Sequence, residues 1–475
     1  MSRPQAGAPG KKNVIKFAIM SVIGVFLFMV PIPHETPEGN VVFNIPLGYA
    51  ISWLGGALNS AVQFAMLGES FGLLFLLACI VITVSFLGSA LAYAVKPAFI
   101  MNSERLKGLF RCNIVYFVSK AIGATLAWLV FFGVGPGWLI GWGGGRLMLN
   151  LISGDSGLMA IFIIIGVAIP LLTDFGLMEF LGVLIKKVIR ILFTLPGRSS
   201  IDLLGSWFSS SAASVIITRD QYEKGYYTGR EAAAICVNFT LVSLPFTFVV
   251  ASTIGLTAHF ALFYLVICVT AILLAIVMPR IWPLRGISDT YLPGVGKRID
   301  EDVPANASLF GQAVRLAGQR AGETGVGHVA RSGVSNWLNI FMDLIPVIMA
   351  WGTIAIIVNE TTPIFQWLSW PFGQFLRLLQ VEGAMYYAHT TIVGFIDMYL
   401  PAFMLGTEAP IQTRFILGAL SIVQIIYLAE TGILILKSKI PLHIGHLAVI
   451  FLMRTIFALP VIVLLTRLLF RPVAG

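Results

Sequence analysis

Small polar side chains interrupt an apolar stretch of the sequence at residues 231–256. Four of them recur at steps of four, three and four residues and so share one helical face; they are Cys236, Thr240, Ser243 and Thr247. Asn238 lies off this face, and Pro245 leaves the carbonyl group of Leu241 without its helical N–H partner. These groups suit a hard cation such as Na⁺, or the hydroxyl groups of a solute. A kinked helix whose hydroxyls bond their own backbone explains the same pattern.

A second apolar stretch, 413–437, also carries polar residues on one helical face; these are Ser421, Gln424 and Thr431. Glu430 lies in the same stretch, with Tyr427 beside the polar face. An ionisable side chain within a membrane span is costly and therefore marks a candidate site. The alternative is a structural carboxyl group that pairs with Arg454 in the last apolar segment.

Two more carboxyl groups lie in apolar surroundings. Asp397 interrupts a further apolar segment within the sequence "GFIDMYLP", and Asp174 lies in the stretch 158–185. A buried carboxyl group holds its proton near neutral pH and can exchange it. Asp174 and Glu430 are therefore candidates for coupling to H⁺ or Na⁺, and so is Asn238 because its amide oxygen can bind a cation. For Asp174, the alternative is a charged carboxylate in a watery vestibule.

Catalytic and metal-binding motifs do not account for the remaining polar residues. His443 and His446 are spaced i, i+3, and His389 precedes Asp397 by eight residues, but neither arrangement has the further ligands of a metal site. The sequence holds no HExxH or GxSxG motif, so an intramembrane hydrolase has no motif in its support. We expect a protein that is not an enzyme and that has no bound metal or cofactor.

The composition indicates what positions these side chains. Of 475 residues, 57% are hydrophobic and 11% are charged, and the mean hydropathy is +0.90. Such a chain is a polytopic helical membrane protein. The net charge of +9 is explained by basic residues in cytoplasmic loops, so we expect no nucleic acid partner.

Apolar segments long enough to cross a bilayer recur along the chain. The clear spans are 14–33, 71–95, 112–133, 158–185, 231–256, 260–280, 337–358, 413–437 and 446–468. Whether 45–66, 363–380 and 384–405 cross is left open. With the N-terminus in the cytoplasm, most Lys and Arg residues fall on the cytoplasmic side only if 201–218 does not cross.

The segment 201–218 carries three consecutive serines, Ser209, Ser210 and Ser211, in its middle. Its charge environment predicts a re-entrant hairpin that turns at these serines, because non-helical backbone at membrane depth survives only when it is buried in protein or lines a wet cavity. A helix interface built from small residues is the alternative.

An internal repeat relates the two halves of the chain. "IPLLTDFG" at 169–176 is echoed by "IPVIMAWG" at 345–352, and each is followed by an amphipathic stretch, an interrupted apolar segment and two spans. The charge pattern inverts one copy relative to the other. Inverted repeats with broken helices are typical of secondary transporters. We therefore expect N-terminal helices (1–157), a first repeat (158–280), a cytoplasmic loop (281–336) and a second repeat (337–475) whose hairpin is 384–405.

The chain resembles the YjiH-type family of Gate-domain, or nucleoside-recognition, membrane proteins, which is similar in architecture to concentrative nucleoside transporters. The resemblance rests on the order of hairpins and broken spans, on "GPGWLIGW" and on "SIDLLGSWFSSSAASVIITRDQYEKGYYTGREAA". It implies an all-α fold of inverted repeats with two re-entrant hairpins. It also implies a smaller YjiG-type Gate-domain partner or a homo-oligomer in the bacterial inner membrane. The nucleoside-contacting motifs of the true transporters are not evident.

In the family that it resembles, the solute and Na⁺ lie between the hairpin tips and the broken helices. Transferred to this sequence, the solute-binding residues are Ser209, Ser210, Ser211, Asn238, Thr240, Ser243, Asp397, Gln424, Glu430 and Thr431. We expect an ion-coupled secondary transporter of a small polar solute, like a nucleoside, an amino acid or a dipeptide. The alternative is a scaffold or regulatory subunit that does not transport.

Overall fold

The computed structural model describes residues 10–35, 41–66, 69–112, 114–140, 145–154, 157–193, 195–197, 199–208, 211–295 and 309–469. Contacts divide the chain into two compact units. Unit 1 comprises Met1–Phe43, Ile169–Val329 and Pro371–Gly475, and unit 2 comprises Asn44–Ala168 and Ala330–Trp370. The expected hairpins and both interrupted spans that follow them belong to unit 1, which therefore holds the candidate site.

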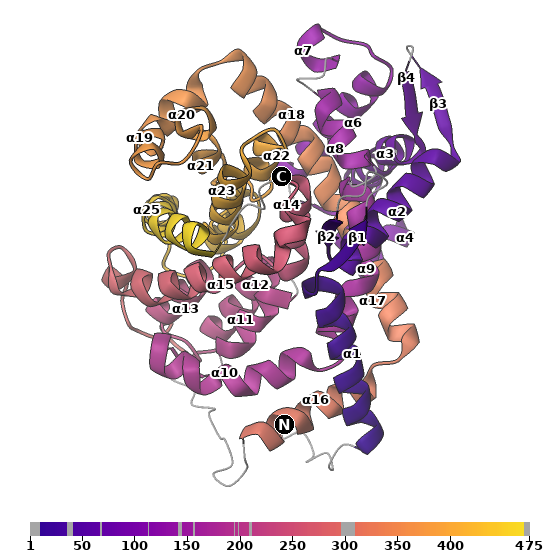
Figure 1. The fold of residues 1–475 in the computed structure, drawn as a ribbon. Coiled ribbons are helices and arrows are strands. Elements are labelled where there is room, and N and C mark those ends of the chain that lie inside the picture. The colour runs from indigo at the N-terminus through magenta and orange to yellow at the C-terminus, as the bar shows by residue number, and fades with distance from the viewer. Residues whose placement is uncertain are drawn as a thin grey trace. The chain divides into compact units, whose positions relative to one another are not determined.

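The protein is an α-helical membrane protein (Figure 1). Within the described residues, four helices are long and apolar enough to cross a bilayer, which takes about 20 residues. They are α1 (Lys11–Met29), α3 (Leu73–Ala94), α15 (Phe260–Val277) with its flanking 3₁₀ turns, and α25 (Ile444–Leu469). Shorter apolar helices, including α6 (Ile114–Phe131) and α14 (Leu244–Thr253), make up the rest of the apolar stretches.

Unit 2 is built around α3, α6 and α18 (Ile345–Thr361), which pack against one another. A Cβ atom on Gly123 would lie 2.4 Å from the carbonyl oxygen of Pro346, so glycine permits α6 to approach α18 closely. Lys120 is fully buried, and its Nζ contacts Ser89 Oγ at 3.4 Å and the carbonyl oxygen of Leu109 at 3.3 Å. Two neutral oxygens are therefore among the partners of this buried lysine in the interior of unit 2.

The other elements that begin in unit 2 are short. They are α2 (Pro46–Ala61), β3 (Gln63–Met66), β4 (Glu69–Gly72), α4 (Ala98–Met101), α5 (Glu104–Phe110), α7 (Gly137–Ile140), α8 (Gly145–Ser153), α9 (Leu158–Thr173), the π-helix η4 (Ile340–Leu344) and α19 (Ile364–Leu378). Strands β3 and β4 form an antiparallel ribbon in which Gln63 pairs with Gly72. The ambiguous segment 45–66 is therefore a helix followed by a strand, and its relation to the bilayer stays a prediction.

Unit 1 holds three of the four candidate spans, α1, α15 and α25, together with shorter elements. These shorter elements are β1 (Ile32–Glu35), β2 (Val41–Asn44), which pairs with β1, α10 (Leu177–Phe193), α11 (Ser199–Phe208), α12 (Ser211–Glu223), α13 (Gly229–Asn238), the 3₁₀ turns η1 (Thr257–His259), η2 (Met278–Arg280) and η3 (Leu284–Gly286), α16 (Leu309–Glu323), α20 (Ala384–Tyr387), α21 (Thr390–Val393), α22 (Leu400–Leu405), α23 (Ile411–Val423), the π-helix η5 (Leu428–Gly432) and α24 (Ile433–Leu436). Helix α17 (Val326–Asn339) begins in unit 1 and continues into unit 2. Among the short helices, α13 and α14 divide the apolar stretch 231–256, and α23, η5 and α24 divide 413–437.

The expected single span 158–185 is wrong, because α9 ends at Thr173 and α10 begins at Leu177. Gly176 adopts φ +100°, where a side chain would be strained, and a Cβ atom there would lie 2.4 Å from the carbonyl oxygen of Ala317. The chain therefore turns sharply onto α16. The amphipathic helix α10 then packs against α16, which also contacts α1.

Candidate functional site

The first predicted interruption is confirmed as a broken helix. Helix α13 ends at Asn238, residues 239–243 are non-helical, and α14 begins at Leu244 with Pro245 in its first turn. A capping box fixes the other end of α13, because Thr228 Oγ1 accepts the N–H of Glu231 at 3.2 Å and Glu231 Oε2 accepts the N–H of Thr228 at 2.8 Å. We call residues 239–243 the first break.

Helix α11 supplies a partner for the carbonyl group that Pro245 leaves free. Ser206, fully buried on α11, donates its hydroxyl to the carbonyl oxygen of Leu241. Helices α11 and α12 pack against each other and form what we call the first hairpin. Ser206 was not among the predicted site residues, although the freed carbonyl of Leu241 was the signal that could have found it. Entry of this hairpin into the membrane stays a prediction.

The second predicted interruption is also confirmed. Helix α23 ends at Val423, and residues 424–427, which we call the second break, lead into the π-helix η5. Ile425 adopts φ +64°, a strained conformation for a β-branched residue. Tyr427 donates its hydroxyl to the carbonyl oxygen of Ser421 at 2.7 Å, and Thr431 Oγ1 donates to that of Ile425 at 3.0 Å. Side chains thus replace the helical bonds that the break removes.

Residues 384–405 are not one helix but three short ones, α20, α21 and α22, and we call them the second hairpin. Asp397 lies in the turn before α22, is 9% exposed, and accepts the N–H of Tyr399 on Oδ1 at 2.8 Å. This bond helps to fix the turn in the manner of a capping residue. The Tyr399 hydroxyl in turn lies 2.9 Å from Thr253 Oγ1 at the end of α14.

The second hairpin is bonded to the second break. Gln424 Nε2 contacts the carbonyl oxygen of Thr391 and Thr455 Oγ1, both at 2.8 Å, and the N–H of Leu428 donates to the carbonyl oxygen of Phe395 at 2.9 Å. Gln424 is fully buried, and its Oε1 has no hydrogen-bond partner among the described residues. Helix α12 of the first hairpin packs against η5 and α24. Both hairpins therefore contact the second broken helix.

Arg454, on α25, joins the two broken helices. Its Nη1 donates to Asn238 Oδ1 at 2.8 Å and to the carbonyl oxygen of Val237 at 3.0 Å. Its Nε and Nη2 donate to the carbonyl oxygen of Val423 at 2.9 and 2.6 Å. The side chain is fully buried. We call Arg454 and the residues around it, Val237, Asn238, Val423 and Gln424, the junction.

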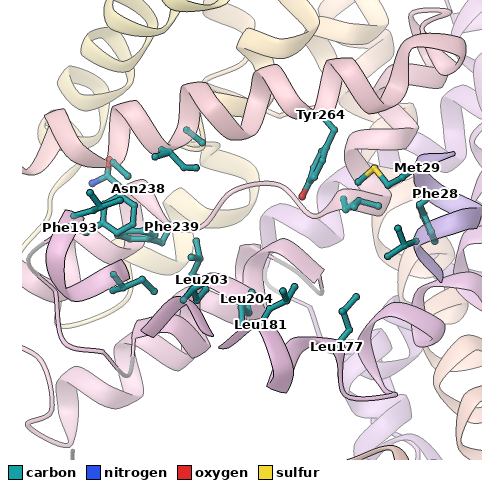
Figure 2. A pocket seen from close by; sticks show the side chains of 18 residues that line it. Phe28, Met29, Leu177, Leu181, Phe193, Leu203, Leu204, Asn238, Phe239 and Tyr264 are labelled. Carbon is teal, nitrogen blue, oxygen red and sulfur yellow. The ribbon is translucent and has the colours of Figure 1, made fainter. Parts of the chain in front are cut away.

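An apolar cavity of about 490 Å³ lies beside the first break (Figure 2). Asn238, Phe239 and Leu244 line it from the broken helix, Leu203 and Leu204 line it from α11, and Tyr264 from α15 points into it. Carbon-rich walls of this kind suit hydrocarbon and offer few hydrogen bonds to a polar solute. The cavity thus gives the first break an apolar flank, while the polar groups of the broken helices lie at the junction.

The structure brings some predicted site residues together and separates others. Asn238 and Gln424 lie at the junction, and Thr431 braces the second break. Thr240 Oγ1 donates to the carbonyl oxygen of Cys236 at 2.6 Å, as the alternative of a self-bonded helix predicts. Ser243, at 8% exposed, lies at the start of α14.

Asp174 belongs to a different cluster, at the turn between α9 and α10. Its carboxylate lies 3.2 Å from His328 Nε2, and Thr324 Oγ1 donates to its carbonyl oxygen at 2.6 Å. Ser211 is buried at the start of α12. Ser209, Ser210 and the side chain of Glu430 lie outside the described part of the structure. The predicted pairing of Glu430 with Arg454 is therefore untested, and the described partners of Arg454 lie at the helix ends that precede the two breaks.

Comparison with known proteins places the chain in a family. The family model described as Gate, nucleoside recognition, matches residues 156–257, which include the first hairpin and the first break. The uncharacterized protein BpOF4_10220 of Alkalihalophilus pseudofirmus is 41% identical over 465 residues, which are 96% of this chain and 95% of that protein. The chain belongs to the Gate-domain family of membrane proteins.

Solved structures give weaker similarities. Variants of CNTnw in an outward-facing state and in the intermediate 3 state are 14% and 13% identical to this Gate-domain protein, with TM-scores of 0.40 and 0.42. They cover 88% and 89% of this chain and 99% and 100% of theirs. The Alcanivorax borkumensis YdaH transporter is 13% identical, with a TM-score of 0.20, and the match covers 96% of each chain.

Proposed function

We propose that this Gate-domain protein is a secondary transporter of the bacterial inner membrane that moves a small polar solute. The observation that carries the proposal is the junction, where two broken helices end against one buried side chain and each break is bonded to a hairpin. Broken helices that meet inside a bundle are the arrangement by which secondary transporters hold solutes at mid-membrane. Backbone groups that a break exposes at membrane depth are tolerated only where another group of the protein, water or a solute replaces the lost helical hydrogen bond.

The chemistry of the junction favours a solute that donates hydrogen bonds. Gln424 Oε1 is buried and has no partner among the described residues, whereas its Nε2 is occupied twice. A buried acceptor without a partner costs about 1–3 kcal/mol, which a solute N–H or O–H would recover. Nucleosides, amino acids and dipeptides carry such donors. The other proposed solute-binding residues are Ser209, Ser210, Ser211, Asn238, Thr240, Ser243, Asp397, Glu430 and Thr431.

Alternating access would arise from movement of the hairpins against the broken helices. The hydrogen bonds that would change include that of Ser206, which ties the first hairpin to the first break, and those to Thr391 and Phe395, which tie the second hairpin to the second break. In the proposed orientation the N-terminus is cytoplasmic, and the protein works without catalysis or a bound cofactor. Asp174, Glu430 and Asn238 are the residues proposed for ion coupling.

The test is solute uptake into proteoliposomes, after a thermal-shift screen of nucleosides, amino acids and dipeptides has found a stabilising solute. We expect Gln424→Met, Asp397→Asn and Glu430→Gln to reduce uptake at least tenfold, equivalent to about 1.4 kcal/mol. Gln374→Met is the matched control, because Gln374 lies on α19, where its Nε2 contacts Met385 Sδ at 3.8 Å, and the substitution should leave uptake unchanged. Uptake that survives Gln424→Met, Asp397→Asn and Glu430→Gln would exclude this site.

One observation favours a second candidate, a scaffold subunit that does not transport. Arg454, Ser206 and Thr431 already bond the protein's own carbonyl groups at both breaks, so a sealed junction needs no solute. Such a subunit would pack against a smaller YjiG-type Gate-domain protein or a second copy of itself. Thiol labelling of Ser211→Cys discriminates between the two, because a transporter exposes this position from one side of the membrane and a sealed scaffold from neither.

A further inference from the structure

The guanidinium group of Arg454 lies where two helices end. Val237 is in the last turn of α13, and Val423 is the final residue of α23, so both carbonyl groups lack a following helical N–H. The C-terminal end of a helix carries about half a negative elementary charge. Two such ends converge on one side chain, together with the amide oxygen of Asn238. The arrangement concentrates negative potential at one buried point.

These oxygens form the coordination shell of a cation. In the described part of the chain, every hydrogen-bond acceptor recorded for Arg454 is a neutral oxygen, either a backbone carbonyl or an amide. Helix C-termini and unwound carbonyls are the groups that hold Na⁺ in broken-helix membrane proteins. The residue pattern 236–247 predicts a Na⁺ site from the same amide. In the structure, the guanidinium group of Arg454 occupies that position, so the positive charge there belongs to a side chain of the protein.

We propose that Arg454 is a resident cation that takes the place of a free Na⁺ at the junction. The guanidinium supplies the positive charge that the two helix ends require, and its N–H groups bond both ends at once. A Na⁺ ion entering beside it would meet a like charge and find Val237, Asn238 and Val423 already occupied. The consequence for ion coupling rests on the proposed transport function. If the protein is a transporter, Na⁺ bound at the junction does not drive the movement of its solute.

The first experiment measures the thermal stability of the purified full-length protein in NaCl, KCl and choline chloride at equal ionic strength. The wild-type protein should have the same Tm in all three salts. In Arg454→Gln, the charge is gone and the oxygens remain, so NaCl should raise Tm by roughly 3 °C over choline chloride at a hundredfold excess over its Kd. A saturable Na⁺-specific rise in the wild-type protein overturns the proposal.

Two further variants make the result specific. Arg454→Lys keeps a positive charge at the junction and should remain indifferent to Na⁺. Arg414→Gln is the matched control, because Arg414 Nη1 donates to the carbonyl oxygen of Ile254 at the end of α14, at 2.7 Å, and has no part in the junction. If Arg454→Gln does not fold, the wild-type and Arg454→Lys measurements still decide, since a Na⁺-specific shift in either contradicts a resident cation.

The outcome is separable from that of the transport test. Uptake that occurs at the same rate in NaCl and choline chloride supports both proposals. Uptake that requires Na⁺, together with a Na⁺-specific shift of Tm, overturns the resident cation and leaves transport intact. Absence of uptake for every solute, with a salt-independent Tm in the wild type and a Na⁺ response in Arg454→Gln, overturns transport and leaves the resident cation intact.

Discussion

Gln424 Nε2 lies 2.8 Å from the carbonyl oxygen of Thr391, so the side chain at the second break is bonded directly to the second hairpin. The same nitrogen contacts Thr455 Oγ1 on α25 at 2.8 Å. These two acceptors fix the orientation of the amide, because only its nitrogen can donate. The second break, α21 and α25 thus meet at one fully buried side chain. Small changes around it should therefore affect the stability of both the second hairpin and the second break.

Gly394→Ala should destabilise the protein by about 1–3 kcal/mol. A Cβ atom at this position would lie 2.3 Å from Gln424 Oε1, and the amide cannot withdraw without losing its bonds to Thr391 and Thr455. The measurement is Tm in detergent. Gly327→Ala on α17 is the control, because a Cβ atom there has no neighbour within 4 Å. Equal Tm values for the two variants would mean that the amide is not held as described.

Ser206→Ala should also cost about 1–3 kcal/mol, because it leaves the carbonyl group of Leu241 buried without a partner. Pro245 cannot supply the missing N–H. Thr270 provides the comparison, since its hydroxyl is equally buried but bonds the carbonyl oxygen of Val266, which lies four residues earlier in the unbroken helix α15. We expect Thr270→Ser, which keeps that hydroxyl, to have a smaller effect on Tm. The reverse order would argue against the bond to Leu241.

At Ile425, glycine should be tolerated better than alanine, which inverts the usual order. Both substitutions remove the same buried side chain from the core, but φ +64° favours glycine by about 1 kcal/mol. Ile426 is the matched control, as it is equally buried and has no positive φ. There alanine should be the milder substitution. Unfolding midpoints for the four variants test this, and alanine milder at both positions would show that the break has a different backbone conformation.

Glu179→Gln should raise Tm at pH 7 slightly, with the gain vanishing near pH 4. Burial raises the pKa of Glu179 above its usual value, despite opposing effects of a backbone hydrogen bond and of Arg320 at 3.6 Å. Asp174 and Glu323 raise it further. A carboxyl group whose pKa is raised on folding stabilises fully below its unfolded pKa and loses that stability as pH rises through the folded value. Glu323→Gln is the comparison, because it removes from an exposed site only one of the charges that raise this pKa, and it should raise Tm at pH 7 by less than Glu179→Gln does.

Much of the helical order could be predicted from the sequence, because polar residues and prolines inside apolar runs report where a helix cannot continue. Pro245 and the polar face around it marked the first break, whereas Ser421, Gln424 and Thr431 were interpreted as one helical face and only the family resemblance implied a second broken helix. The span 158–185 was predicted wrongly because apolarity continues through the turn at Gly176. That turn depends on contact with Ala317, far away in the chain, which no local pattern reveals.

The candidate site was harder to predict than the fold. Oxygen ligands at Asn238 were recognised, but their recorded donor, Arg454, was considered only as a partner of Glu430. Distances across the fold decide such pairings, since Arg454 lies more than two hundred residues from Asn238 in the sequence. Ser206 was overlooked for the opposite reason. The three serines that follow it indicated a site at the tip of the first hairpin, whereas the hydrogen bond to the first break comes from Ser206 within helix α11.

The apolar cavity beside Asn238, Phe239 and Leu244 gives the first broken helix free volume at its break. The first and second breaks should therefore differ in how easily they rearrange. The first break is bonded to its hairpin by Ser206, but side chains around it can repack into existing free volume. The second break has the hydrogen bonds to Thr391 and Phe395 to rupture before it can shift. Hydrostatic pressure favours states with smaller internal voids, so it should loosen the packing of α13 and α14 at a lower pressure than that of α23 and α24. Conformational change in this protein would then begin in its N-terminal repeat and reach the other through the arginine between them.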